Sequence, residues 1–407
     1  MDSELLNFLA AVVVVLVAAK LAGYASIRLG QPSVLGELLV GILLGPTLLN
    51  MLGAWPLLGG DEHLADSLTL FAEIGVILLM FLAGLELDLR DLLRSGRVAG
   101  LAGTLGVVVP LAGGFITARL FGVETVEAIF IGLALSATSV SISAQTLMEL
   151  GVLRTKVGLG LLGAAVFDDI LVVLLLSGAS VVFGAAEGGA GLAVILLRMV
   201  LFLAGATGVG LFVVPWLMAR VEELPVSQAV PTAALVICFV FAWASEALGG
   251  MAAITGAFMA GLFLARTAYD RQIEHSLASL AYGLFVPIFL VNIGLQANLR
   301  AISGTAWFLA IALTVVAIFT KVIGSGLGAL AGGFDRRDSL RLGVGMISRG
   351  EVGLIVASVA LGAGLISQEI FSGVVFMVIV ATLVTPPLLR LTYRDEAPAP
   401  AANPRTD

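Results

Sequence analysis

The chain has 407 residues and a formal net charge of −7; 59% of its residues are hydrophobic, only 12% are charged, and its mean hydropathy is +1.11. Charged residues make up about 25% of a typical soluble protein, so this composition leaves too little polar surface for a soluble fold. It indicates an integral membrane protein and excludes nucleic-acid-binding, disulfide-rich secreted and disordered chains.

Apolar runs of about 17–25 residues are long enough to cross a bilayer as helices. The sequence predicts about thirteen such spans, at residues 5–28, 34–52, 68–87, 96–120, 126–149, 157–182, 190–219, 227–248, 250–266, 275–296, 304–331, 338–363 and 369–392. The predicted fold class is therefore an all-α integral membrane protein. Residues 394–407 are rich in Pro and Ala and are expected to form a short cytoplasmic tail without regular structure.

The basic residues between the predicted spans lie mainly on one side. The loops on that side and the C-terminal segment carry Arg28, Arg90, Arg94, Arg97, Arg154, Lys156, Arg220, Arg266, Arg271, Arg336, Arg337, Arg341, Arg390, Arg394 and Arg405. The loops on the other side carry only Arg119 and Arg300. Because cytoplasmic loops carry an excess of Lys and Arg, an odd number of spans puts the N-terminus outside and the C-terminus in the cytoplasm.

Segments in the two halves of the chain resemble each other. Residues 35–44 (LGELLVGILL) resemble residues 255–264 (TGAFMAGLFL), and residues 84–89 (GLELDL) resemble residues 294–299 (GLQANL). Matching spans are seven apart, an odd number, so the two halves are predicted to have inverted topology. Secondary transporters are commonly built in this way, with the site near the middle of the membrane. The alternative is chance recurrence of small-residue patterns.

Three ionisable residues lie in the middle of predicted spans, where a charge costs about 2.5–3.5 kcal/mol on insertion scales. Asp168 and Asp169 fall within the span 157–182, and Lys321 falls within the span 304–331. Adjacent helical positions differ by about 100° in direction, so one aspartate can face a lysine while the other faces an ion cavity. A partly desolvated carboxylate can exchange a proton for Na⁺. The alternative is a buried Asp–Lys pair that only fixes helix packing.

Two predicted spans are interrupted by small and polar residues. These residues are Ser136, Thr138, Ser139, Ser141 and Ser143 in one span, and Ser348, Arg349, Gly350, Glu351 and Gly353 in the other. Both spans are predicted to unwind, and the ends of broken helices carry partial charges that need opposite charges nearby. Arg349 and Glu351 are predicted to compensate these ends, with direct ion handling as the alternative. The Ser and Thr side chains could also simply join neighbouring helices by hydrogen bonds.

These motifs resemble those of the monovalent cation:proton antiporter family, specifically the bacterial NapA-type Na⁺/H⁺ antiporters of the Kef-related branch. The resemblance covers nearly the whole chain. The segments that carry it are QPSVLGELLVGILLGP (31–46), LALSATSVSISAQTLMELGVL (133–153), GAAVFDDILVV (163–173), FVPIFLVNIGLQANL (285–299), FTKVIGSGLGAL (319–330) and GMISRGEVGLIVA (345–357). The Asp-Asp pair with the downstream lysine is the most specific of these features.

The resemblance implies two domains. An ion-transporting core would comprise residues 96–182 and 301–393, with two broken helices that cross. Scaffold or dimerisation helices would comprise residues 1–95 and 183–300, the latter including a linker helix.

The resemblance also assigns the site residues. It implies that Asp169 binds Na⁺, that Asp168 pairs with Lys321, and that Thr138 and Ser139 lie next to the ion. The expected partners are membrane lipid, monovalent cations, protons and a second copy of the chain, with no nucleic acid and no cofactor; the only expected metal is the transported Na⁺ at Asp169.

The resulting prediction is a secondary transporter in the bacterial inner membrane that exchanges Na⁺ or Li⁺ for H⁺ electrogenically by elevator-type alternating access. An enzyme is not expected, because the sequence has no Walker loop, metal-spaced His/Cys set or nucleophile motif. The alternatives are a K⁺/H⁺ antiporter on the same fold, an ion channel and a sodium-coupled solute symporter. Kef-type relatives carry Gln-Asp at the acidic pair and a nucleotide-binding domain; Asp-Asp and the expected lack of such a domain favour ungated Na⁺ exchange.

Overall fold

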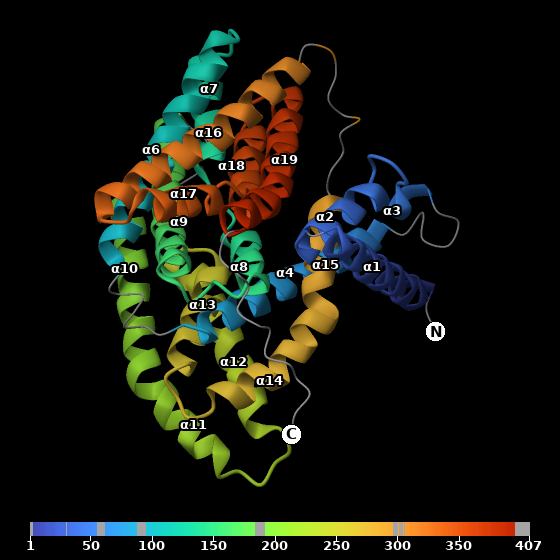
Figure 1. Cartoon of the computed structure of the whole chain (residues 1–407), viewed down its shortest axis with the longest axis vertical. Helices are drawn as coiled ribbons and strands as arrows, with labels where there is room; N and C mark the ends of the chain where they lie inside the picture. Colours follow the sequence, from blue (N-terminus) through green and yellow to red (C-terminus); the bar gives the residue numbers. More distant parts are fainter. Residues whose placement is uncertain are drawn as a thin grey trace.

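The computed structural model of the protein describes residues 3–29, 31–54, 62–87, 95–183, 192–295, 300, 304 and 306–394. Every regular element in these ranges is a helix (Figure 1). Ten helices are long and apolar enough to cross a membrane, and three shorter apolar helices accompany them. Each predicted span overlaps one of these, which confirms the all-α membrane fold. The predicted tail lies outside the described residues beyond Arg394.

One group of helices packs around the predicted broken spans. It consists of α6 (Gly96–Leu120), α7 (Thr125–Ser136), α8 (Val140–Glu149), α9 (Lys156–Val182), α16 (Ala306–Gly332), α17 (Arg336–Gly345), α18 (Glu351–Gly362) and α19 (Gln368–Thr392). Glycines allow α16 to approach α6 closely: a Cβ at Gly324 or Gly328 would lie 2.4 Å from a backbone carbonyl oxygen of α6. We call these helices the α6/α16 group.

The remaining helices form a second group, which we call the α4/α13 group. It consists of α1 (Ser3–Arg28), α2 (Ser33–Leu44), α3 (Met51–Ala54), α4 (Glu62–Leu85), α12 (Ala229–Ala244), η2 (Ser245–Gly249), α13 (Ala253–Leu264), α14 (Asp270–Leu280), η3 (Ala281–Phe285) and α15 (Val286–Leu295). The run α10 (Leu192–Gly208), η1 (Val209–Val213) and α11 (Val214–Glu222), on the left of Figure 1, contacts both groups: α10 packs on α9 and on η2.

The predicted span 34–52 extends beyond the observed helix. Helix α2 ends at Leu44, and a turn separates it from the short α3. The reason is Pro46, because the residue before a proline avoids the helical conformation. Gly45 accordingly has extended backbone angles, φ −73° and ψ −177°.

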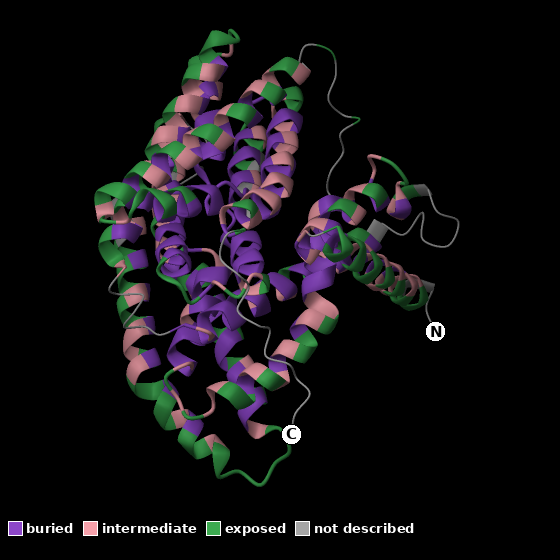
Figure 2. Ribbon diagram, viewed as in Figure 1, coloured by how far each residue is buried: buried purple, intermediate pink, exposed green. Residues whose placement is uncertain are grey.

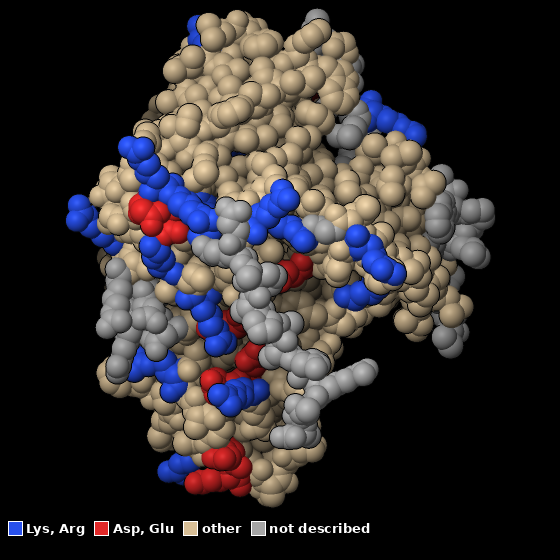
Figure 3. Space-filling model, in the orientation of Figure 1, with Lys and Arg blue, Asp and Glu red and all other residues tan. Residues whose placement is uncertain are grey.

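The surface of the molecule is rich in apolar side chains. Buried residues fill the interior, whereas exposed residues follow the outer faces of helices such as α1 and α11 (Figure 2). Leu21, Phe212 and Trp243 are each more than 60% exposed, which suits contact with lipid rather than water. On the face seen in Figure 3 the charged side chains lie mainly in the middle and lower parts of the molecule, and the surface above them is largely uncharged.

Candidate cation site

Both helices that the sequence predicts to be broken are broken in the structure. Helix α7 ends at Ser136 and α8 begins at Val140, with Ala137 and Ser139 in extended backbone conformations. Helix α17 ends at Gly345 and α18 begins at Glu351. Each break leaves a helix C-terminus and a helix N-terminus facing the interior of the α6/α16 group.

The two breaks cross each other and are joined by hydrogen bonds. The backbone N–H of Ser139 donates to the carbonyl oxygen of Ser348 (2.9 Å), and the Ser348 hydroxyl donates to the carbonyl oxygen of Ser139 (2.5 Å). The Ser143 hydroxyl donates to the carbonyl oxygen of Gly345 at the end of α17 (2.5 Å). Backbone groups that the breaks would leave unsatisfied are therefore partly paired across the crossing.

Gly350 is expected to be needed for this crossing, because a Cβ there would lie 2.6 Å from both Cβ and Oγ of Ser139. Gly350→Ala should therefore lower the stability of the folded protein by about 1–3 kcal/mol, the usual cost of overpacking. The measurement is thermal melting of the detergent-purified protein. Gly205→Ala is the control, since a Cβ at Gly205 meets nothing within 4 Å. Equal melting of the two variants would contradict the expectation.

Asp168 lies in a fully buried ion pair. The Nζ of Lys321 is 3.1 Å from Asp168 Oδ2 and 3.3 Å from Oδ1, and both side chains are 0% exposed. The hydroxyl of Thr138, in the α7–α8 break, donates to the same carboxylate. Thr138 therefore contacts Asp168 directly.

Lys321 also makes two contacts that the sequence did not indicate. Its Nζ donates to the carbonyl oxygens of Gly106 and Ser136, both at 2.7 Å. Ser136 is the last residue of α7, so the ammonium faces the partial negative charge at a helix C-terminus. Lys321 thus compensates one broken helix as well as pairing with Asp168.

Arg349 lies at the other break and is also fully buried. Its guanidinium donates to the carbonyl oxygens of Met346 and Ala317, each at 3.2 Å. Met346 directly follows α17, so Arg349 lies near the negative end of that helix. Glu351 is the first residue of α18, but its side chain lies outside the described part of the structure, and its role stays a prediction.

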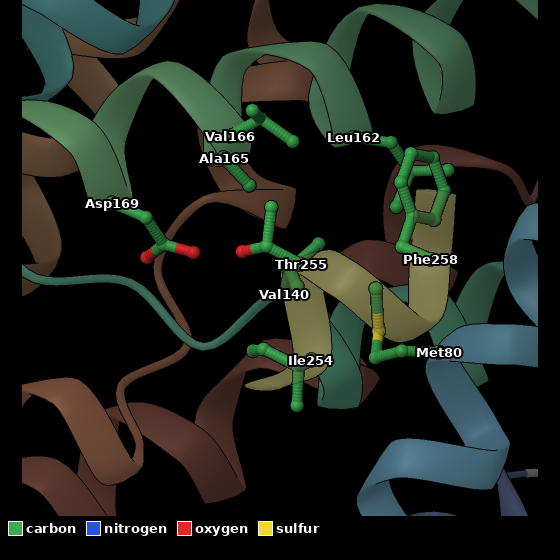
Figure 4. Close-up of a pocket in the computed structure, with 9 residues that line it drawn as sticks. All are labelled: Met80, Val140, Leu162, Ala165, Val166, Asp169, Ile254, Thr255 and Phe258. Carbon is green, nitrogen blue, oxygen red and sulfur yellow. The ribbon is translucent and has the colours of Figure 1, made fainter. Parts of the chain in front are cut away.

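Asp169 is the next residue on α9, about 100° further around the helix than Asp168. Its side chain lines a small pocket with a volume of about 10 Å³, which is about what one water molecule requires (Figure 4). The other lining residues come from α4, α8, α9 and α13: Met80, Val140, Leu162, Ala165, Val166, Ile254, Thr255 and Phe258. Ser139 lies at the helix crossing, where its buried hydroxyl has no hydrogen-bond partner among the described residues.

A larger cavity of about 540 Å³ adjoins this pocket and shares Ile254 with it. It lies between the two groups of helices, and its polar lining residues include Glu73, Glu246 and Asn292. On α4 it is lined by residues 69–77, in the half of the helix farther from the Arg-rich loops. The pocket at Asp169 therefore adjoins open space on the side of the molecule opposite those loops.

Polar contacts join the two groups at the end where the Arg-rich loops lie. Glu149, at the end of α8, accepts hydrogen bonds from the backbone N–H (2.8 Å) and the hydroxyl (2.5 Å) of Ser33, at the start of α2. Nearby, Arg154 Nε is 3.9 Å from Glu86 Oε2, and burial raises the pKa of the Glu86 carboxyl. Polar contacts from α8 and from the loop that follows it therefore join the two groups at this end.

Comparison with known proteins identifies the family. The family described as "Sodium/hydrogen exchanger, transmembrane" matches residues 12–391, nearly the whole chain. The chain belongs to the sodium/hydrogen exchanger family. This confirms the family predicted from the acidic pair and the downstream lysine, and it makes the protein a cation/proton antiporter, hence a transporter rather than an enzyme.

Individual sodium/hydrogen exchangers match over almost their full length. The "Na(+)/H(+)-K(+) antiporter GerN" of Bacillus cereus is 44% identical over 388 residues, which cover 95% of this chain and 96% of GerN. The "Na(+)/H(+) antiporter" of Enterococcus hirae is 37% identical, covering 95% of this chain and 98% of its own.

The fold also matches a solved exchanger structure. The sodium proton antiporter MjNhaP1 of Methanocaldococcus jannaschii superposes with a TM-score of 0.73, covering 97% of each chain at 17% identity. At this identity the likeness shows the fold alone.

Proposed function

We propose that this exchanger transports Na⁺ or Li⁺ in exchange for H⁺, with Asp169 as the group that binds either the cation or the proton. The observation that carries this proposal is the position of Asp169, which lines a pocket of about 10 Å³ beside the crossing of two broken helices. A carboxylate in so small a pocket is a hard ligand for a small cation, and a proton competes for the same oxygens.

The buried pair beside the pocket supports electrogenic exchange. Asp168, the residue before Asp169 on α9, forms an ion pair with Lys321, and the two charges offset each other. If Na⁺ binding releases protons from both aspartates, one net charge moves in each cycle. At 100 mV that charge is worth about 2.3 kcal/mol, which would couple transport to the membrane potential.

Alternating access is proposed on the packing of the two helix groups. The α6/α16 group contains the predicted core segments 96–182 and 301–393, and it would move as one body against the α4/α13 group. Such a movement would close the cavity at one end and break the Glu149–Ser33 contact at the other.

We further propose that the protein forms a homodimer in the bacterial inner membrane. The Arg-rich loops favour an orientation with the N-terminus outside and the C-terminus inside.

K⁺ is the second candidate cation. The name of GerN, which is 44% identical to this chain, includes K⁺ as well as Na⁺. The small pocket at Asp169 favours Na⁺ and Li⁺, because a larger ion would need the lining side chains to move.

The proposal is tested with purified protein in proteoliposomes that contain a pH-sensitive dye. Addition of Na⁺ or Li⁺ should dequench the dye strongly, and K⁺ should do so less. A response to K⁺ alone would replace the first candidate by the second. The lack of a response to all three cations would contradict cation/proton exchange by this protein.

A further inference from the structure

A single hydroxyl group faces Asp169 across the small pocket. Thr255 lies in the first turn of α13 and is only 4% exposed. Its hydroxyl oxygen points toward the carboxylate of Asp169 (Figure 4). Apart from these two, every side chain that lines the pocket is apolar. The pocket therefore offers a cation two side chains with oxygen atoms, one from each group of helices.

The hydroxyl of Thr255 is unusual among the buried threonines of this chain. Thr146, Thr314 and Thr385 each donate to the carbonyl oxygen four residues earlier, at 2.7–2.8 Å. In the described part of the structure the Thr255 hydroxyl makes no such hydrogen bond, although the residue is only 4% exposed. Its place in the first turn explains this, because the residue four positions earlier, Met251, lies outside the helix. The hydroxyl is therefore available to bind an ion or a water molecule in the pocket.

We propose that Thr255 Oγ1 is a ligand of the transported cation, opposite Asp169. This rests on the proposed function and adds a residue to the same site. A hydroxyl oxygen suits a hard monovalent cation, and it replaces part of the water shell that the ion loses in an apolar pocket. When the cation is absent and Asp169 carries a proton, the same hydroxyl can accept a hydrogen bond from the carboxylic acid.

The two oxygens belong to different moving parts. Asp169 is on α9, which packs on α6, whereas Thr255 is on α13, which packs on α4 and α12. A movement of one group against the other would separate the hydroxyl from the carboxylate. Thr255 would then strengthen cation binding only in the conformation whose cavity lies on the side away from the Arg-rich loops. The exchanger would bind its cation more weakly once that movement has occurred, which favours release.

The test compares Thr255→Val with Thr255→Ser in proteoliposomes. Valine keeps the shape and removes the hydroxyl, so the half-maximal concentration of the cation that the wild type exchanges should rise about tenfold, equivalent to about 1.4 kcal/mol. The maximal rate of exchange should stay within about twofold of the wild-type rate. Thr255→Ser should restore the wild-type value. Thr69→Val is the matched control, because Thr69 lines the neighbouring cavity but already donates to Ala65 O (2.9 Å).

A second readout does not depend on transport. Na⁺ or Li⁺ should raise the melting temperature of the detergent-purified wild type and of Thr255→Ser, and should raise that of Thr255→Val less. If valine gives poor folding, Thr255→Ala provides the same comparison. The role of Thr255 would be overturned if the hydroxyl-free variant kept the wild-type half-maximal concentration. It would also be overturned if Thr255→Ser weakened cation binding as much as Thr255→Val does. Failure of the wild type to exchange any cation would instead overturn the proposed function.

Discussion

Replacing Asp169 by asparagine is expected to abolish cation/proton exchange and to leave the protein folded. Asparagine keeps the size of the side chain, which is only 8% exposed in its pocket, but removes both the negative charge and the exchangeable proton. Exchange should fall at least about 100-fold, because the loss of a carboxylate ligand removes binding of both ions at once. The measurement is Na⁺-driven proton flux in proteoliposomes, with melting and size-exclusion profiles to verify the fold.

Asp66→Asn provides the matched control for this experiment. Asp66 is an exposed aspartate on α4, outside the pocket and the large cavity, so its replacement should leave exchange unchanged. Robust proton flux in the Asp169→Asn variant would show that the exchanged ions bind elsewhere. Loss of flux in both variants would point to a general effect of removing negative charge.

The acidic pair and its lysine could be predicted because charge in an apolar run is costly. Asp168, Asp169 and Lys321 stand out in spans that are otherwise aliphatic, and the 100° between adjacent helical positions already separates the two aspartates. The helix breaks could be predicted for a similar reason, since clustered Gly, Ser and Thr interrupt the apolar pattern. These features are local, and the sequence displays them directly.

The contacts that complete the site could not be predicted. Gly106 binds Lys321 through a carbonyl oxygen, which every residue carries, so its side chain gives no signal. Thr255 lies in the first turn of an apolar helix, and its side chain alone gives no signal of a role. Only its position opposite Asp169 in the structure singles it out. Both depend on how helices distant in the chain pack together.

Lys321→Gln is expected to remove the net charge movement of transport without removing transport itself. The amide of glutamine is neutral, so Asp168 loses its counter-charge in a site that is 0% exposed. A buried carboxylate without a partner avoids a penalty of several kcal/mol by keeping its proton. Na⁺ binding at Asp169 would then release one proton instead of two, and exchange would become electroneutral.

The measurement is a capacitive-current recording on Lys321→Gln proteoliposomes, alongside the dye assay of proton flux. Lys156→Gln is the control, because Lys156 is 61% exposed and pairs with Asp335 (3.6 Å) and Asp338, away from Asp168 and Lys321, so its replacement should affect neither signal. Lys321→Arg keeps the positive charge and should retain current if it folds. Undiminished current with normal flux in Lys321→Gln would contradict the role of Lys321 as the counter-charge of Asp168.

Lys321 also donates to two backbone carbonyl oxygens, so a loss of folded protein in Lys321→Gln could have two causes. The amide nitrogen of glutamine can still donate to Ser136 O or Gly106 O, so the C-terminus of α7 would keep a hydrogen bond but lose a full positive charge. Asp168→Asn in the Lys321→Gln background removes the carboxyl group that has lost its counter-charge. If the ion pair sets the charge balance, this double variant should melt near the wild type and carry no current. If Lys321 mainly stabilises the end of α7, the double variant should melt as low as Lys321→Gln alone.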